Sequence, residues 1–153
     1  MHITFSQAKE YIDKYFQQYP GVLAWMEKIV EETKKNGFVT TYWGRRRYIP
    51  GIFEKNRSLY EEARRVAINT VAQGTAAEIM KLGMINLTKA IAHESLNAHI
   101  VLQIHDELLI SVAKEQADRA QQLVTHVLEQ VVDWPVALEV KTRQGTNWAE
   151  VSK

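Results

Sequence analysis

The sequence predicts an α+β fold in which a small antiparallel sheet packs against long helices. Two β-prone arms, residues 100–104 and 108–112, flank a short polar interruption and predict a β-hairpin. Apolar residues recur at helical spacing over residues 57–93 and again over residues 114–131. Residues 136–140 alternate in polarity and predict a strand that adds to the hairpin. Together these patterns predict a sheet of hairpin plus C-terminal strand, backed by two helices.

The polar interruption of the hairpin consists of His105, Asp106 and Glu107. Tight hairpin turns favour Asn-Gly or Asp-Gly because they need positive φ, and Glu107 suits the second turn position poorly. One interpretation is that the two acids solvate a loop between core strands. The other is that they were selected for chemistry, and the hairpin alone leaves both open.

The composition sets broad limits on the class of protein. A chain of 153 residues with 46% hydrophobic residues can form one globular domain with a real core. Lys and Arg number 19 against 18 Asp and Glu, so net charge neither requires nor excludes a nucleic-acid partner. The absence of cysteine excludes disulfides and thiolate metal sites and fits a reducing compartment. No apolar run approaches the roughly 20 residues of a membrane span, so we expect a cytoplasmic protein that does not enter the membrane.

Two helices are expected at the amino terminus, over residues 6–19 and 22–35, as an antiparallel pair. The first carries an aromatic face with Tyr11, Tyr15 and Phe16. Such a face is more often core than ligand site. We therefore expect it to be buried.

A basic cluster, Arg45, Arg46 and Arg47, follows a β-prone segment at residues 38–43. The three cations could belong to a solvated loop with some cation–π contact to neighbouring aromatic residues. Alternatively, they could bind phosphates through charge-assisted, bidentate hydrogen bonds. The sequence leaves the two interpretations near parity.

The long helical segment contains a polar stripe, because Arg65, Asn69 and Gln73 are spaced i, i+4, i+8 and share one face. A polar stripe is usually the solvated side of a helix, but amide and guanidinium groups are also the usual readers of base edges. Gly74 and Gly83 each cost a helix about 1 kcal/mol relative to alanine. A kink or a close approach at one of them is therefore expected.

Four motifs occur in order along the chain, and together they resemble the carboxy-terminal part of family A DNA polymerases, the DNA polymerase I type. The motifs are Gly-Arg-Arg-Arg-Tyr-Ile-Pro at residues 44–50, Arg-x-x-x-Asn-x-x-x-Gln-Gly-Thr-Ala-Ala at residues 65–77, Gln-Ile-His-Asp-Glu-Leu at residues 103–108 and Gly-Thr-Asn-Trp at residues 145–148. The resemblance covers essentially the entire chain. It implies that residues 1–56 are the end of the fingers region and residues 57–153 a palm part containing the hairpin.

The resemblance implies template-directed, magnesium-dependent nucleotidyl transfer to a primer 3′-OH, in DNA replication or repair. It makes Asp106 a ligand of Mg²⁺ and places Glu107 beside it as the second catalytic acid. The implied partners are a DNA primer–template and deoxynucleoside triphosphates. Residues implied to contact the minor-groove side of the primer–template are Arg65, Asn69, Gln73 and His105, with Arg45, Arg46 and Arg47 contacting DNA more loosely.

The chain also departs from the family pattern. It begins after the family's motif A aspartate and after the fingers helix that holds the nucleotide, and Met1-His2 resembles an added start. We therefore expect an incomplete chain that is inactive alone and needs the missing N-terminal polymerase portion as a partner. A palm hairpin without its neighbouring strands is expected to self-associate or to be partly disordered.

Three substitutions fall within the long helix: Arg64 stands where the family usually has glutamate, Val71 where it has proline and Glu78 where it has aspartate. They leave the path of that helix open. The alternative function is a non-catalytic module for nucleic-acid binding or assembly that retains the palm fold.

Overall fold

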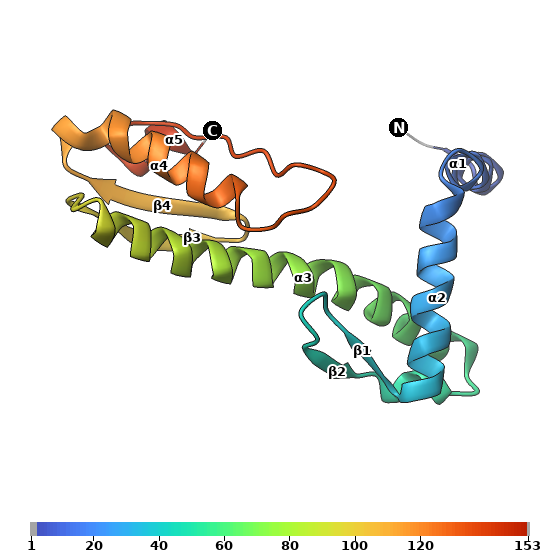
Figure 1. Ribbon diagram of the computed structural model, residues 1–153. Coiled ribbons are helices and arrows are strands. Elements are labelled where there is room, and N and C mark those ends of the chain that lie inside the picture. Colours follow the sequence, from blue (N-terminus) through green and yellow to red (C-terminus); the bar gives the residue numbers. More distant parts are fainter. Residues whose placement is uncertain (1–2, 153) are drawn as a thin grey trace. The chain divides into compact units, whose positions relative to one another are not determined.

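A computed structural model describes residues 3–152, so the expectation for Met1-His2 lies outside the described residues. The chain is a helix-rich α+β protein, as predicted, and its described part contains two antiparallel sheets of two strands each. Its helices are α1 (Phe5–Gln18), α2 (Pro20–Asn36), α3 (Arg57–His93), α4 (Ala117–Glu129) and α5 (Trp148–Val151), with short 3-10 helices at Pro50–Phe53 and Lys114–Gln116. Its strands are β1 (Phe38–Thr40), β2 (Arg46–Tyr48), β3 (Ala98–Ile104) and β4 (Glu107–Val112) (Figure 1).

The chain divides into two compact units, and the boundary lies inside α3, between Thr75 and Ala76. The first unit contains the elements from α1 to the first half of α3. The second contains the rest of α3 and everything that follows. The division into a fingers region at residues 1–56 and a palm part at residues 57–153 remains a prediction.

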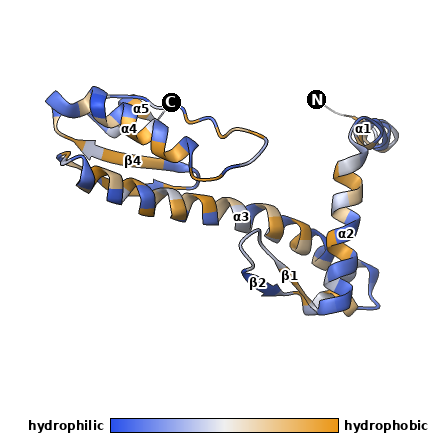
Figure 2. Cartoon of the chain, viewed as in Figure 1, coloured by the Kyte–Doolittle hydropathy of each residue, from blue (hydrophilic) through white to orange (hydrophobic). Residues whose placement is uncertain are grey.

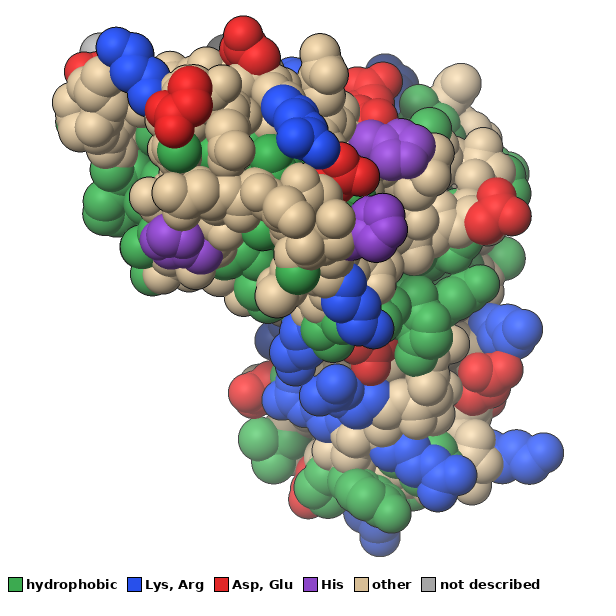
Figure 3. Space-filling model, turned by 60° about the vertical axis from the view of Figure 1, so that its left-hand side comes forward, with side chains coloured by type: hydrophobic (Ala, Val, Ile, Leu, Met, Phe, Trp, Pro, Cys, Tyr) green, Lys and Arg blue, Asp and Glu red, His purple; other side chains and the backbone are tan. Residues whose placement is uncertain are grey.

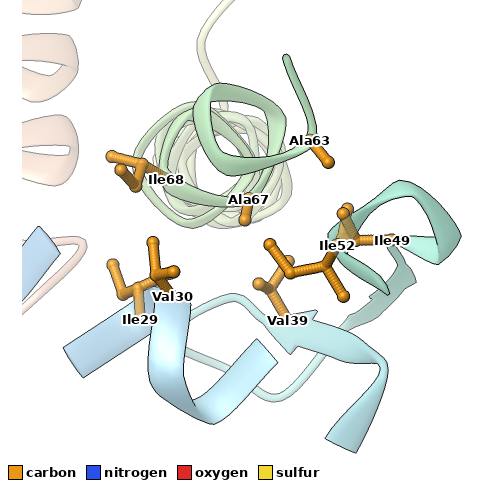
Figure 4. Close-up of a cluster of buried hydrophobic side chains, with 8 residues drawn as sticks. All are labelled: Ile29, Val30, Val39, Ile49, Ile52, Ala63, Ala67 and Ile68. Atoms are coloured by element: carbon orange, nitrogen blue, oxygen red, sulfur yellow. The ribbon is translucent and has the colours of Figure 1, made fainter. Parts of the chain in front are cut away.

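The core of the first unit is formed where α2, β1 and the 3-10 helix meet one face of α3. Figure 4 shows the buried side chains that these elements contribute, pointing toward one another. Ala63 and Ala67 on α3 are small, which lets neighbouring elements approach the helix closely. α2 ends as predicted, because Gly37 adopts φ +77° and its N–H donates to the Thr33 carbonyl. The buried set is Ile29, Val30, Val39, Ile49, Ile52, Ala63, Ala67 and Ile68.

The expectation that the aromatic face of α1 is buried was wrong. α1 has no buried residue, and Phe5 is 88% exposed. No described element buries a residue of this helix. A capping box between Thr4 and Gln7 stabilises its first turn locally. The antiparallel arrangement was also wrong: Figure 1 shows α1 end-on beside α2, and only Tyr19 connects them.

The second strand of the first unit, β2, was not predicted from the sequence, because it lies in the basic cluster, whose polar residues do not suggest a strand. β1 and β2 pair antiparallel, with Phe38 opposite Tyr48 and Thr40 opposite Arg46. β1 is therefore shorter than the predicted strand at residues 38–43, and the chain turns back through a loop in which Gly44 has φ +84°. Figure 2 shows β2 as strongly hydrophilic.

The second unit contains the predicted hairpin, in which β3 pairs antiparallel with β4 and a register irregularity falls between Ile100 and Leu102. β4 is largely apolar (Figure 2). The hairpin packs with α3 and α4 around a buried cluster that consists of Leu87, Ile91, Leu96, Ala98, Ala120 and Val124. This arrangement confirms a hairpin packed on two helices.

The strand expected at residues 136–140 is absent from the sheet, which contains only β3 and β4. The segment is bonded to α4 instead. The Val140 N–H donates to Glu129 Oε1 at 3.1 Å, and Gln121 Nε2 donates to Thr142 Oγ1 at 2.7 Å. Pro135 supplies no N–H for a ladder at the start of the segment. The alternating polarity of this segment therefore does not indicate strand pairing.

α3 runs without interruption through the three positions that depart from the family pattern. The close approach expected at its glycines is present. A Cβ built on Gly74 would lie 2.6 Å from Thr41 Cγ2, and one on Gly83 would lie 2.9 Å from Leu128 Cδ2. No helix among the described residues has the length and apolar character needed to span a membrane.

Candidate active site and nucleic-acid interface

The acidic residues lie at the turn of the β3–β4 hairpin. Ile104 pairs with Glu107, so His105 and Asp106 form a two-residue loop and Glu107 begins β4. The sequence suggested that Glu107 occupies the second position of the turn, whereas the turn lies one residue earlier in the chain. All three side chains are exposed.

The backbone of this turn is unusual, because His105 has φ +52°. In two-residue hairpins with positive φ at the first position, glycine is the usual residue. The His105 carbonyl accepts a hydrogen bond from Gln103 Nε2 at 3.1 Å, which ties the loop to β3. A non-glycine residue held in this region is a reason to suspect function at the turn.

The carboxylates of Asp106 and Glu107 are hard oxygen ligands. Mg²⁺ is commonly held by one or two carboxylates together with substrate phosphates and water. Within residues 3–152, no cluster of three or more His, Asp or Glu side chains is placed to hold a metal ion. The acid pair therefore fits part of a magnesium site, to which other oxygens would have to contribute.

The polar stripe lies in the first unit, on one face of α3. Arg65, Asn69 and Gln73 are all exposed, whereas Ala63 and Ala67 on the same helix are buried. The predicted common face is therefore confirmed. This face presents a guanidinium and two amides, which can donate to acceptors on base edges.

The three arginines of the basic cluster are exposed but differ in their contacts. The Arg46 guanidinium lies 4.8 Å from the centre of the Phe38 ring. Arg47 Nη1 donates to Thr70 Oγ1 at 3.0 Å, which ties β2 to α3. Arg46 and Arg47 thus have defined positions on the hairpin, a condition for presenting charge to a partner.

The loop between β1 and β2 rests on α3. The Tyr42 N–H donates to Thr75 Oγ1 at 3.1 Å, and the Thr41 methyl lies against Gly74. Sequence reasoning missed Thr41 and Thr75 as positioning residues. The clue was Gly74 itself, since a glycine inside a helix indicates a close approach, and Thr75 follows it with a hydroxyl able to accept.

The structure therefore brings Arg45, Arg46 and Arg47 and the stripe into one compact unit, where the loop meets α3 directly after Gln73. His105, Asp106 and Glu107 belong to the other unit.

Residues 1–150 match the family described as DNA polymerase family A. The chain is 43% identical over 148 residues to DNA polymerase I of Bacillus caldotenax and 40% identical over 151 residues to the thermostable DNA polymerase I of Thermus filiformis. A solved POL domain of Pol1 from M. smegmatis, in complex with DNA primer-template and dNTP, superposes with a TM-score of 0.93 at 36% identity. The protein belongs to DNA polymerase family A.

The matches cover nearly all of this chain but little of its relatives. The chain is covered to 97% and 99% in the two sequence comparisons and spans 17% and 18% of those proteins. In the structural comparison it is covered to 99% and spans 27% of the solved chain.

Proposed function

We propose that this chain forms part of a template-directed DNA polymerase that transfers nucleotides to a primer 3′-OH in DNA replication or repair. The observation that carries the proposal is the hairpin turn, where His105 has positive φ and the exposed acids Asp106 and Glu107 follow. The family supports it, as does a structural neighbour that binds DNA primer-template and dNTP. The proposed location of the protein is the cytoplasm, together with its DNA substrate.

In this proposal Asp106 is a ligand of Mg²⁺, and Glu107 is the second acid of the site. When bound, Mg²⁺ stabilises the charge that develops on the attacking and leaving oxygens. The two-residue loop holds the Asp106 carboxylate at the exposed end of the hairpin, where substrate phosphates could reach it. Further oxygen ligands come from substrate and from the rest of the polymerase.

The proposed DNA contacts divide into two classes. Arg65, Asn69, Gln73 and His105 contact the minor-groove side of the primer terminus, where donors find the same acceptors on every correct base pair. The exposed side chains of Arg45, Arg46 and Arg47 contact phosphates. The first class judges pair geometry, and the second contributes salt-dependent affinity.

Activity is proposed to require a further, amino-terminal polymerase portion as partner, with residues 1–56 contributing to the fingers and residues 57–153 to the palm. The chain spans under a fifth of the two sequence relatives described above. In the family resemblance, a second metal-binding aspartate and the nucleotide-binding helix come from that portion. A two-metal centre stabilises both the attacking and the leaving oxygen, and oxygen ligands beyond Asp106 and Glu107 would have to help hold its ions.

Primer extension tests the proposal. The chain alone should not extend a primer, whereas the chain mixed with the amino-terminal portion of a family A polymerase should. Asp106→Ala should abolish the restored activity. Asp13→Ala, which removes an exposed aspartate of α1, should leave it intact.

Extension that survives Asp106→Ala would overturn the assignment of this residue. DNA binding by the mixture without any extension would favour the alternative, a non-catalytic binding or assembly module.

The two classes of DNA contact are separable in the same reconstituted system. Arg46→Ala should lower the salt dependence of DNA binding by about one unit of slope. Gln73→Ala should leave the salt slope unchanged and reduce extension from a correct terminus. Discrimination between correct and incorrect base pairs should fall by roughly 1–3 kcal/mol. If Gln73→Ala extends and discriminates as well as the unmodified chain, the stripe is only the solvated face of α3.

A further inference from the structure

We propose that the β1–β2 hairpin is a stacking platform for unpaired bases of single-stranded DNA, with Tyr42 and Trp43 as the stacking residues. This goes beyond the proposed function because binding of a single strand requires neither the acidic hairpin nor catalysis.

The first observation is the exposure of two adjacent aromatic side chains at the loop. Tyr42 is 63% exposed and Trp43 is 42% exposed. Their rings meet edge to face, with centroids 4.9 Å apart and planes at 76°. Isolated exposed aromatic residues are common on protein surfaces, but a paired, oriented set at the tip of a hairpin is a candidate binding surface.

The second observation is that a further aromatic pair lies on the same hairpin. Phe38 and Tyr48 face each other across β1 and β2, with ring centroids 5.7 Å apart. The Arg46 guanidinium lies over the Phe38 ring. One cation of the basic cluster therefore lies against an aromatic ring of the same hairpin.

The charge of the surface selects the partner. Arg45, Arg46 and Arg47 are exposed and directly follow the Tyr42–Trp43 pair in the chain. Figure 3 shows Lys and Arg side chains gathered beside hydrophobic ones over the part of the molecule that carries β1 and β2. Aromatic side chains beside a basic track are the composition of non-specific single-strand binding surfaces, because every base has a π-face and every nucleotide a phosphate.

The third observation is the order of the loop backbone. The Thr41 N–H donates to the Arg45 carbonyl, and the Gly44 N–H donates to the Thr41 carbonyl, both at 2.9 Å. The Arg45 N–H donates to Thr41 Oγ1 at 3.1 Å. With Tyr42 N–H bonded to Thr75, the loop is held before any ligand arrives, which lowers the entropic cost of binding.

A duplex would not use this surface in the same way. Base faces are stacked inside a duplex, so only phosphates would be available to the hairpin, whereas an unpaired strand offers both groups. Single-stranded DNA, such as template beyond the paired region, is therefore the occupant that the aromatic and basic residues fit together.

The test is fluorescence anisotropy with the full 153-residue chain and a labelled oligothymidylate. Tyr42→Leu and Trp43→Leu should each weaken binding about 5- to 140-fold, since a stacked base contributes about 1–3 kcal/mol. The matched controls are Tyr11→Leu and Trp25→Leu, whose aromatic residues are 60% and 41% exposed but lie on α1 and α2. Both controls should bind as the unmodified chain does.

Two further measurements separate stacking from charge. On an oligonucleotide of abasic sites, Tyr42→Leu should cause no loss, because no base is left to stack. Arg46→Ala should reduce the salt slope by about 0.7, the value for one phosphate of a single strand, whereas the leucine variants should not change it. Trp43→Phe retains a ring and should retain most of the affinity, which guards against misreading a folding defect.

The proposal is overturned if the unmodified chain does not bind the single strand at concentrations up to about 100 μM, the weak end of the range typical of non-specific sites. It is also overturned if the leucine variants bind as tightly as the unmodified chain, or if they lose as much affinity on the abasic strand as on the intact one. These outcomes are independent of primer extension. Failure here leaves the polymerase proposal standing, and failure of extension leaves this one standing.

Discussion

Gly74 is where a single added methyl group should reveal how tightly the β1–β2 loop rests on α3. A Cβ at this position would lie 2.6 Å from Thr41 Cγ2, far inside the roughly 3.5–4.0 Å that is the optimal separation of two non-bonded carbon atoms. Thr41 cannot move easily, because it is buried and both its N–H and its Oγ1 are hydrogen-bonded to Arg45. Gly74→Ala should therefore displace the loop.

The expected magnitude follows from two opposing terms. Replacing glycine by alanine inside a helix gains about 1 kcal/mol. Forcing a methyl group into a packed contact costs about 1–3 kcal/mol, and the bonded Thr41 favours the upper half of that range. The net expectation is a loss of about 1–2 kcal/mol in the free energy of unfolding. Gly21→Ala in α2, with no atom within 4 Å of its new Cβ, should instead be neutral or stabilising.

Urea denaturation followed by circular dichroism measures this in a double-mutant cycle with Thr41→Ser. That variant removes Cγ2 and retains the Oγ1 acceptor for Arg45 N–H. In the Thr41→Ser background, Gly74→Ala should be neutral or stabilising, since the clashing methyl is gone. Hydrogen exchange of the Tyr42 amide should accelerate in Gly74→Ala alone, because its bond to Thr75 is disturbed.

A Gly74→Ala variant as stable as the unmodified chain, or the same loss in the Thr41→Ser background, would contradict a clash between the two methyl groups. The first result would mean that the loop yields to the helix without cost, and the second that the loss does not arise from the contact with the Thr41 methyl group.

Further predictions concern the second unit. Leu87→Ala, at a fully buried position, should cost about 2–5 kcal/mol in urea denaturation, whereas Ile85→Ala, on the exposed side of the same helix, should cost about 0.5 kcal/mol or less; equal losses would contradict the core assignment. The pKa of the Glu94 carboxyl lies below its ordinary 4.5, chiefly because the Arg119 guanidinium donates a hydrogen bond to it. Its contribution to stability is therefore present above the ordinary pKa and lost as pH falls through the folded one. NMR titration of Arg119→Gln should show the Glu94 pKa rising, and an unchanged pKa would exclude Arg119 as the cause. The exposed apolar residues Val101 and Leu102 of β3 should make the chain self-associate with concentration, and Val101→Lys should reduce this in sedimentation velocity; a strictly monomeric unmodified chain would rule it out.

Features with local causes were predictable from the sequence. The end of α2 at Gly37 follows from the left-handed conformation that glycine adopts at little cost, and the length of α3 follows from helical periodicity on both sides of the small residues around Gly74. The β3–β4 hairpin follows from two apolar arms around a polar interruption. The candidate site residues were recognised from four motifs in order, a signal that requires no knowledge of contacts.

Features with non-local causes were not predictable. The sequence of β2 is polar enough to indicate a loop, and only its pairing with β1 makes it a strand. The pattern at residues 136–140 suits a strand, but the Val140 N–H donates to Glu129 of α4, and Gln121 of α4 donates to Thr142 just beyond the segment. The seating of Thr41 on Gly74 depends on residues 33 positions apart, which no local pattern relates.

Sequence patterns were enough to recognise the family, the order of the main helices, the hairpin and the residues proposed to contact DNA and metal. Which faces are covered became visible only in the packed fold. The aromatic face of α1 has the composition of a core face, yet no described element packs on it, while the small residues Ala63 and Ala67 lie at the centre of one. The physical reason is that periodicity and turn chemistry act over a few residues, whereas burial depends on which distant segment arrives to exclude water.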